Sequence, residues 1–278
     1  MDIKQILLVQ SPTPDCEAAV GMAETLARHD GARVAGICLF SDPSPTPAET
    51  YAVGEEAIGE VLEHQWASVK ALTAPVESLF KKLLIDRGLS DGWAVGEIEE
   101  WRDSVVQRAR LADLVVLGSA GATPDFQRLA EMLVLGSGTP CLIVPPVKRA
   151  RYDFKRIVIA WNGSREAKRA MDDALPWLKR ASAVAAVIIA EEATRWVDRA
   201  QAEVLTRHLA RHDVNADIIR VDAHGRASGR VLLDQCKAFD ADLLVMGAFG
   251  RSRAAELILG GATRTILPGA SLPVLLSH

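Results

Sequence analysis

Four glycines follow a short apolar run near the C-terminal end of the chain. Residues 246–267 read MGAFGRSRAAELILGGATRTIL and contain Gly247, Gly250, Gly260 and Gly261. Glycine within a helix costs roughly 0.5–1 kcal/mol relative to alanine, so the adjacent pair requires an explanation through packing or a ligand. Backbone N–H groups left uncovered where a strand turns into a helix can bind phosphate. The pattern therefore indicates phosphate binding, and close packing of a helix on a sheet is the alternative.

Cysteine and histidine show no pattern typical of a metal site. Four cysteines are scattered along the chain without CxxC spacing: Cys16, Cys38, Cys141 and Cys236. Buried, reduced cysteine behaves as a small hydrophobic residue, so we interpret all four as inert thiols. His208 and His212 are four residues apart on a predicted helix, but no third ligand lies near them in the sequence. We expect this pair to lie on a solvated helix face.

The sequence does not favour an enzyme. Ser164, Asp222 and His224 supply the residue types of a hydrolase triad, but no GxSxG motif places the serine after a strand. The stretch WNGSREA instead predicts that Ser164 caps a helix beginning at Arg165. His224 follows a predicted strand, and we expect it to lie in a solvated loop.

Composition narrows the class of protein. The chain has 278 residues, 49% of them apolar, with a net charge of -4 at pH 7. This balance predicts a folded globular protein and argues against a nucleic-acid partner, which would require a basic surface. The N-terminal run MDIKQILLVQ is too short for a signal peptide, and no stretch approaches the roughly 20 apolar residues of a membrane span. We therefore expect a soluble, cytoplasmic protein with no membrane partner.

The chain contains an internal repeat with three anchors in the same order. The first pairs KQILLVQSPTPDCEAAV near the N-terminus with KRIVIAWNGSREAKRAM from Lys155. The second pairs RLADLVVLGSAG with AFDADLLVMGAFG, and the third pairs SGTPCLIVPP with ASLPVLLSH at the C-terminus. These anchors predict two related domains, residues 1–147 and 153–278, joined by a proline-containing, charged linker.

Within the second half, short strands rich in valine, isoleucine and leucine alternate with helices. This order is typical of a doubly wound (Rossmann-like) α/β domain with a parallel sheet covered on both faces. We expect the first half to share this fold. It is longer because residues 48–87 form a predicted helical insertion without an equal in the second half.

The whole chain resembles the tandem form of the universal stress proteins. The second half matches their nucleotide-loop pattern, GxxGx9G followed by serine or threonine, at Gly247, Gly250 and Gly260, while Gly261 replaces the hydroxyl residue. The resemblance implies a five-stranded parallel sheet of order 3-2-1-4-5 in each domain, flanked by helices. It also implies that ATP, where it is bound, lies across the carboxyl ends of strands 1 and 4, the switch point of the sheet.

The resemblance places ATP in the second domain only. Phosphate would lie against the four glycines, and the adenosine end near Ala160, Asn162 and Ile189. Asn162 stands where members that bind ATP carry an acidic residue, and its amide can still donate and accept hydrogen bonds.

The first half departs further from the nucleotide-loop pattern. Glu131 stands ten residues beyond Gly121, and Pro124 and Asp125 interrupt the loop. Ser11 occupies the acidic position of this half. A carboxylate near phosphate in a partly desolvated site is unfavourable, so we interpret this loop as degenerate.

The last strand of each half is a candidate interface. CLIVPP and PVLLSH are apolar, and a lone domain would leave such an edge unprotected. In the resembling family two domains pair through these strands, which here would give a pseudo-twofold dimer within one chain; a homodimer of chains could add to it.

Two hypotheses for function follow. The first is a nucleotide-responsive stress or regulatory module without strong turnover, and the second is an interaction scaffold that binds no nucleotide. A weak ATPase ranks third, because the fold does not determine the chemistry. The sequence identifies no protein partner.

Overall fold

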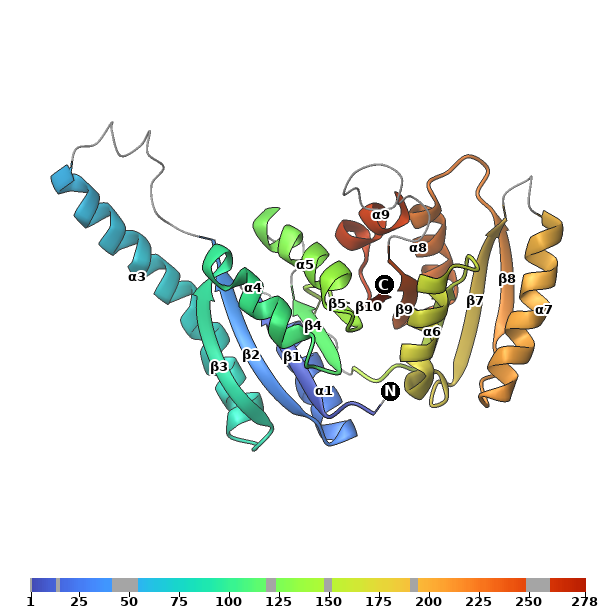
Figure 1. Ribbon diagram of the computed structural model, residues 1–278, viewed down its shortest axis with the longest axis horizontal. Helices are drawn as coiled ribbons and strands as arrows, with labels where there is room; N and C mark the ends of the chain where they lie inside the picture. Colours follow the sequence, from blue (N-terminus) through green and yellow to red (C-terminus); the bar gives the residue numbers. More distant parts are fainter. Residues whose placement is uncertain are drawn as a thin grey trace.

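The computed structural model describes residues 2–13, 16–41, 55–118, 124–147, 152–190, 195–248 and 261–278. Two α/β halves lie side by side, and the N- and C-terminal ends of the chain lie near the middle of the molecule (Figure 1). No helix in the described ranges is both long enough and apolar enough to cross a membrane.

A single ten-stranded sheet runs through both halves in the order β3-β2-β1-β4-β5-β10-β9-β6-β7-β8. The strands of the first half are β1 (Gln5–Gln10), β2 (Arg33–Phe40), β3 (Ser90–Glu97), β4 (Leu114–Gly118) and β5 (Cys141–Val144). Those of the second half are β6 (Arg156–Ala160), β7 (Ala183–Ala190), β8 (Asp217–Asp222), β9 (Leu243–Gly247) and β10 (Val274–Ser277). Strands are parallel within each half, and both halves have the order 3-2-1-4-5, so the predicted fold class is confirmed.

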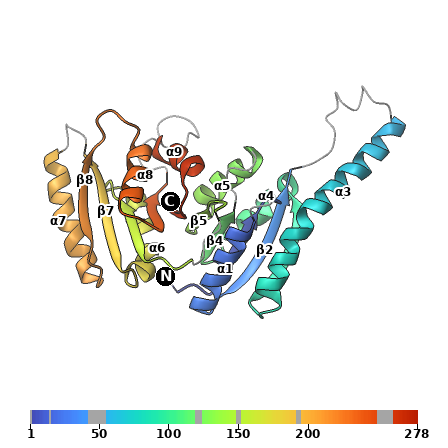
Figure 2. The same ribbon diagram turned by 180° about the vertical axis from the view of Figure 1, so that it is seen from behind.

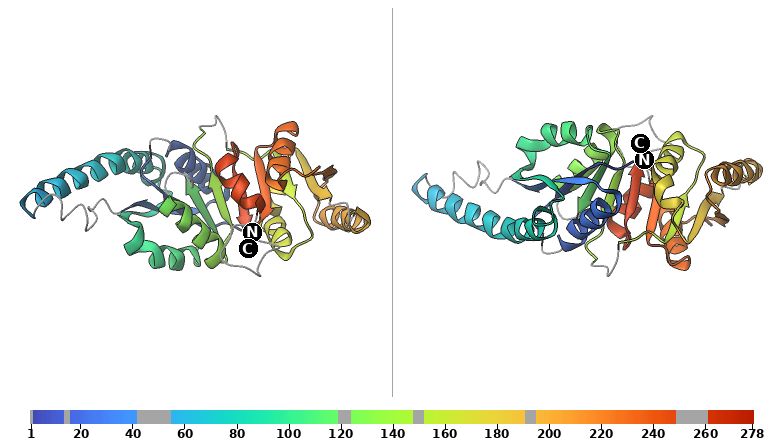
Figure 3. Two further views of the ribbon diagram at one scale, coloured as in Figure 1. Left: turned by 90° about the horizontal axis from the view of Figure 1, so that it is seen from above. Right: turned by 90° about the horizontal axis from the view of Figure 1, so that it is seen from below.

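Helices cover both faces of this sheet (Figure 3). One face carries α1 (Glu17–Asp30), α3 (Glu55–Phe80) with the π-helical turn η1 (Lys81–Ile85), α6 (Arg165–Leu178) and α7 (Arg195–Arg211). The other carries α4 (Ile98–Ala109), α5 (Pro124–Gly136), α8 (Ser228–Ala238) and α9 (Gly261–Gly269). Figure 2 shows α1 and α3 in front of the strands of the first half.

The apolar runs of the strands follow from this double coverage. In β1, Ile6 and Leu8 join the core beneath α1 and α6, whereas Leu7 and Val9 join the core beneath α5 and α9. Successive side chains of a strand point to opposite faces, so a strand with helices on both sides needs consecutive apolar residues. This requirement explains the sequence ILLV.

The predicted insertion at residues 48–87 is instead an extended crossover helix. Helix α3 connects β2 to β3, the position that α7 occupies between β7 and β8, so the expectation that it has no equal was wrong. It has 26 residues against 17 in α7. Its C-terminal part is anchored by the fully buried Val76 and Phe80, and its N-terminal part projects beyond the sheet (Figure 1). Residues 48–54 of the expected helix lie outside the described residues.

One aspartate of the repeat has the same structural role in both halves. The side chain of Asp113 accepts hydrogen bonds from the backbone N–H groups of Lys4 and Gln5 at 2.8 and 2.9 Å. Asp242 accepts the equivalent bond from Lys155 at 2.7 Å, and further bonds from the next residue. Each aspartate thus fixes the start of strand 1 against the start of strand 4, which explains its place in the repeated motif.

The two halves join through an antiparallel pair of strands. In β5 and β10 the paired residues are Cys141 and Leu276, Leu142 and Leu275, and Ile143 and Val274. All of them are buried. This seam closes two sheet edges that would otherwise leave backbone groups and apolar side chains unprotected.

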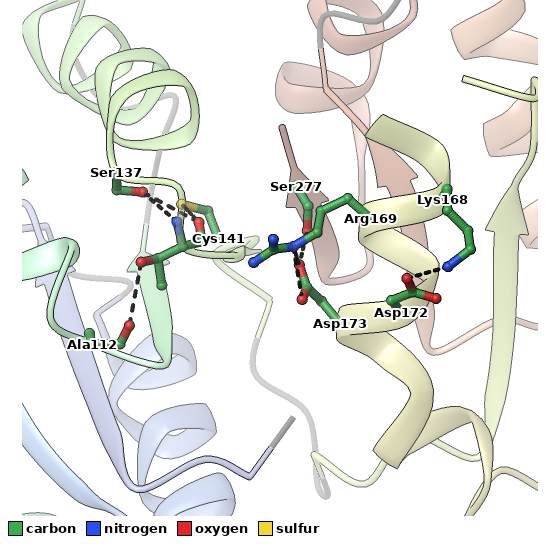
Figure 4. Close-up of polar contacts among 9 residues, drawn as sticks. Ala112, Ser137, Cys141, Lys168, Arg169, Asp172, Asp173 and Ser277 are labelled. Atoms are coloured by element: carbon green, nitrogen blue, oxygen red, sulfur yellow. Dashed lines mark hydrogen bonds and ion pairs between the residues drawn. The ribbon is translucent and has the colours of Figure 1, made fainter. Parts of the chain in front are cut away.

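Polar contacts accompany the seam. Asp173 of α6, only 9% exposed, accepts hydrogen bonds from Ser277 Oγ and Arg169 Nε, both at 2.9 Å, and so holds α6 against the end of β10 (Figure 4). At the far end of α6, Arg180 Nη1 lies 3.3 Å from Asp30 Oδ1 of α1, which adds an ion pair between the halves.

The paired leucines of the seam generate a prediction. Leu142 and Leu275 are fully buried, so Leu142→Ala or Leu275→Ala should each lower the free energy of unfolding by about 2–5 kcal/mol. The double variant should lose less than the sum, because the two side chains share one packing site. Chemical denaturation measures these values. Leu111→Ala, at a residue 80% exposed, is the matched control; an equal loss there, or strict additivity of the seam pair, would contradict the predicted coupling.

Candidate functional site

The carboxyl ends of three neighbouring strands bring the described residues of the predicted site to one edge of the sheet. Gly247 ends β9, Ala160 ends β6 beside it, and Ile189 is the penultimate residue of β7. Asn162 lies two residues beyond β6. This edge is the switch point of the second half, because α6, which follows β6, and α9, which follows β9, pack on opposite faces of the sheet.

Only part of the glycine pattern lies in the described residues. Gly250 and Gly260 fall outside them, and Gly261 is the first residue of α9. Helix α9 packs on the same face of the sheet as Ala160 and Ile189, both of which are half-buried. The first glycine of the pattern is therefore at the end of β9, and Gly261 begins a helix on the face where these two apolar residues lie.

Gly247 has a packing explanation. It lies within β9, and a Cβ atom there would lie 2.4 Å from the backbone nitrogen of Ala167 and 2.5 Å from the carbonyl carbon of Glu166. The first half repeats the arrangement, because a Cβ on Gly118 would lie 2.6 Å from the Cβ of Ala19. In both halves the last residue of strand 4 must be glycine for the first helix to approach the sheet.

The loop between β6 and α6 is ordered by its own side chains. Asn162 Oδ1 accepts a hydrogen bond from the backbone nitrogen of Ser164 at 3.0 Å, and Gly163 takes a φ of 71°. Ser164 Oγ accepts from the backbone nitrogen of Ala167 at 3.1 Å, so the predicted helix cap is confirmed. The amide oxygen that could contact a ligand is thus engaged within the loop.

Next to this loop, the carboxylate of Glu166 is paired with the guanidinium group of Arg165. Glu166 is 5% exposed and accepts a hydrogen bond from Arg165 Nε at 2.6 Å. Burial raises the pKa of Glu166, but the Arg165 contacts and the hydrogen bonds at the helix N-terminus outweigh it and hold the pKa below its usual value. The carboxylate therefore stays ionised, and Arg165 offsets its charge beside the strand ends.

The residue types of a triad do not form one. His224 Nδ1 lies 3.6 Å from Asp222 Oδ1, but the His224 side chain is 81% exposed. No hydrogen bond joins Ser164 to His224, both of which the structure describes, and Ser164 Oγ serves as a helix cap. This arrangement supplies neither an activated hydroxyl nor a positioned base.

The first half differs at the equivalent edge in a way that the sequence patterns missed. Gln10 and Ser11 occupy the positions of Trp161 and Asn162, and they are 0% and 3% exposed. Among the residues that the structure describes, no hydrogen-bond partner is found for either polar atom of the Gln10 side chain, for Ser11 Oγ or for Trp161 Nε1. Buried polar atoms usually have partners, so this edge is unusual. In the sequence, the only indication of this feature was the polar residue Gln10 directly after the apolar run ILLV.

The proline of the first-half loop begins a helix. Pro124 is the first residue of α5, a position that suits proline because the missing N–H has no partner in a helix. Asp125 accepts hydrogen bonds from Ser41 Oγ at 3.0 Å and from Arg128 at 2.7 Å. The two residues that interrupt the glycine pattern in the first half thus begin α5.

The residues described contain no group of three or more side chains that could hold a metal ion. His208 and His212 stack edge to face with ring centroids 4.8 Å apart, and His208 Nε2 lies 4.0 Å from Asp172 Oδ1. The four cysteines, all within the described residues, are buried and form no disulfide. Burial raises the pKa of Cys38, Cys141 and Cys236 to about 12.

Comparison with known proteins finds one family model that matches the second half. Residues 153–278 match the model of the Universal stress protein family. No curated protein sequence matches the chain.

Similar folds are found among solved structures. A universal stress protein from Archaeoglobus fulgidus DSM 4304 shares 13% identity with a TM-score of 0.65, over 98% of this chain and 97% of that chain. A functionally unknown protein from Pseudomonas aeruginosa PAO1 shares 14% identity with a TM-score of 0.61, over 99% and 92% of the two chains. At these identities the likeness establishes the fold of the whole chain.

Gly247 provides a test of the packing explanation. Gly247→Ala would place a Cβ against the α6 backbone, and we expect a loss of about 1–3 kcal/mol in the free energy of unfolding. Gly136→Ala, where the nearest atom to the added Cβ is 3.9 Å away, is the matched control and should cost nothing measurable. Unchanged stability in Gly247→Ala would show that packing does not require this glycine.

The cysteines provide a second test. At about pH 8 a thiol whose pKa is about 12 is protonated, and only the thiolate attacks a disulfide. We expect an aromatic disulfide reagent to react very slowly with the native chain and rapidly with four thiols after unfolding in guanidinium. Rapid reaction of Cys38, Cys141 or Cys236 in the folded protein would contradict their burial.

Proposed function

We propose that this chain, whose residues 153–278 form a universal stress protein domain, is a tandem universal stress protein with a second, degenerate copy in residues 1–147. Three observations support the tandem arrangement. Both halves have the strand order 3-2-1-4-5, both use an aspartate at the start of strand 4 in the same way, and the similar folds extend over nearly the whole chain.

We further propose that the second half binds ATP and acts as a nucleotide-responsive stress or regulatory module without strong turnover. The observation that carries this proposal is the GxxGx9G spacing, which begins at the last residue of β9 in the half that matches the family. Strand β9 lies beside β6, so the pattern starts at the switch point where ligands of open α/β sheets bind.

The described residues at this edge fit a nucleotide. Ala160 and Ile189 present half-buried apolar surface on the face of the sheet where α9 packs, which suits a nucleoside. Phosphate would then lie against the backbone N–H groups of the glycine pattern before α9. Residues at this edge supply binding rather than chemistry, because the Ser164 hydroxyl caps a helix and His224 is exposed.

An interaction scaffold that binds no nucleotide is the second candidate. Packing against α6 accounts for Gly247 without a ligand, and Asn162 Oδ1 is engaged by Ser164. A weak ATPase ranks third. A cytoplasmic location, a homodimer of chains and a protein partner are further proposals that either candidate accommodates.

Calorimetry with ATP and magnesium distinguishes the two candidates. We expect about one site per chain and a rise in melting temperature at saturating ATP, because a ligand that binds only the folded state stabilises it by mass action. Gly260→Glu should abolish both effects by placing a side chain and a negative charge where phosphate would lie.

Ala238→Glu introduces the same side chain at an exposed position at the end of α8 and should leave ATP binding unchanged. If folded wild-type protein gives neither heat nor a thermal shift with millimolar ATP, the scaffold function replaces the nucleotide-responsive one. Binding retained by Gly260→Glu would place the nucleotide elsewhere.

A further inference from the structure

A second candidate ligand site lies between α1 and η1 of the first half and the segment that leads into β6 of the second half. It is a pocket of about 490 Å³. Its lining includes Glu24, Arg28, Leu83, Arg87, Tyr152 and Asp153. Helix α1 runs back from the carboxyl end of β1 to the start of β2, so this pocket lies toward the amino ends of the strands. It is therefore separate from the edge formed by Ala160 and Gly247.

A buried carboxylate stands at the wall of this pocket. Glu24 is 7% exposed, and its Oε1 atom accepts a hydrogen bond from Arg87 Nη1 at 2.6 Å. Arg28 Nη1 lies 3.7 Å from the same oxygen. No described residue donates a hydrogen bond to the second oxygen, Oε2. A buried carboxylate needs charged or hydrogen-bonding partners, and Arg87 and Arg28 supply them at Oε1, while Oε2 can still accept a hydrogen bond.

Cationic donors are also available. Arg28 donates no hydrogen bond to a described residue, and its side chain is 67% exposed at the pocket. Arg87 follows the π-helical turn η1, which contributes Leu83 to the lining; such turns are frequent at functional sites. Asp153 adds a second carboxylate, 3.8 Å from Lys155. The lining thus carries two guanidinium and two carboxylate groups.

Apolar surface completes the pocket. Tyr152 packs on α1 where Gly21 provides room, since a Cβ on Gly21 would lie 3.0 Å from the tyrosine ring. The ring of Tyr152 and the side chain of Leu83 both line the pocket. A bound molecule would therefore meet opposite charges together with an apolar surface.

We propose that this pocket binds a small zwitterion with the chemistry of a free amino acid. The ligand carboxylate accepts hydrogen bonds from Arg28 and the remaining N–H groups of Arg87, the pairing that guanidinium groups favour. The ligand ammonium donates to Glu24 Oε2 and Asp153, and its apolar part contacts Leu83 and Tyr152. A phosphate dianion is disfavoured, because the two carboxylates offset the two guanidinium groups and leave the lining with no net positive charge. The volume is within the range of small-molecule sites.

Calorimetry on the full chain with three matched probes tests this proposal. L-Phenylalanine carries both charges, 3-phenylpropionate carries only the carboxylate, and 2-phenylethylamine carries only the ammonium. We expect binding of L-phenylalanine and at least about tenfold weaker binding of the other two, since each lacks one charge-assisted set of hydrogen bonds. Comparable affinity for 3-phenylpropionate, or no heat with L-phenylalanine, would overturn the proposal.

Two variants locate the site. Arg28→Gln should weaken L-phenylalanine binding about tenfold or more and leave the fold intact, because the Arg28 side chain is 67% exposed. Arg102→Gln is the matched control, because Arg102 forms a comparable helix-surface ion pair with Glu99 and lies outside the pocket. Unchanged binding in Arg28→Gln would refute the assignment. Gly260→Glu should retain L-phenylalanine binding, which separates this site from the proposed ATP site.

Discussion

The antiparallel pairing of β5 with β10 is the contact on which the rest of the molecule depends. Both strands are buried, and a lone half would expose one of them as an unpaired apolar edge. Once they pair, the strand orders of the halves become mirror images along a single sheet, and each of the two cores runs beneath helices from both halves. The switch points, between β1 and β4 in the first half and between β6 and β9 in the second, then lie on either side of the seam.

Much of this fold could be predicted from local patterns. Apolar runs marked the strands, and the repeated aspartate, proline and glycine anchors aligned the halves. The helix cap at Ser164 followed from its neighbours alone. The equivalence of α3 and α7 could not be predicted from the sequence, because the two helices differ in length and no repeated motif aligns them.

The site was less predictable, because its chemistry depends on contacts between distant residues. Gly247 matches a nucleotide pattern, yet the backbone of α6 is what excludes a side chain there. Asn162 turns its oxygen into its own loop. The pair of Glu24 with Arg87 joins residues 63 positions apart, and no spacing rule indicates such a contact.

The register of the seam has a consequence for how the two halves can change. Leu142 faces Leu275 at its centre, but Cys141 faces Leu276 on one side while Ile143 faces Val274 on the other. In a symmetric dimer of identical chains these flanking pairs would have to be the same, and every substitution would occur twice. Here β5 and β10 belong to one chain and have different sequences. A substitution in one strand therefore occurs once, and a change in the residue that it faces on the other strand can compensate for it. Covalent linkage thus leaves each half free to change its own residues while the shared sheet stays intact.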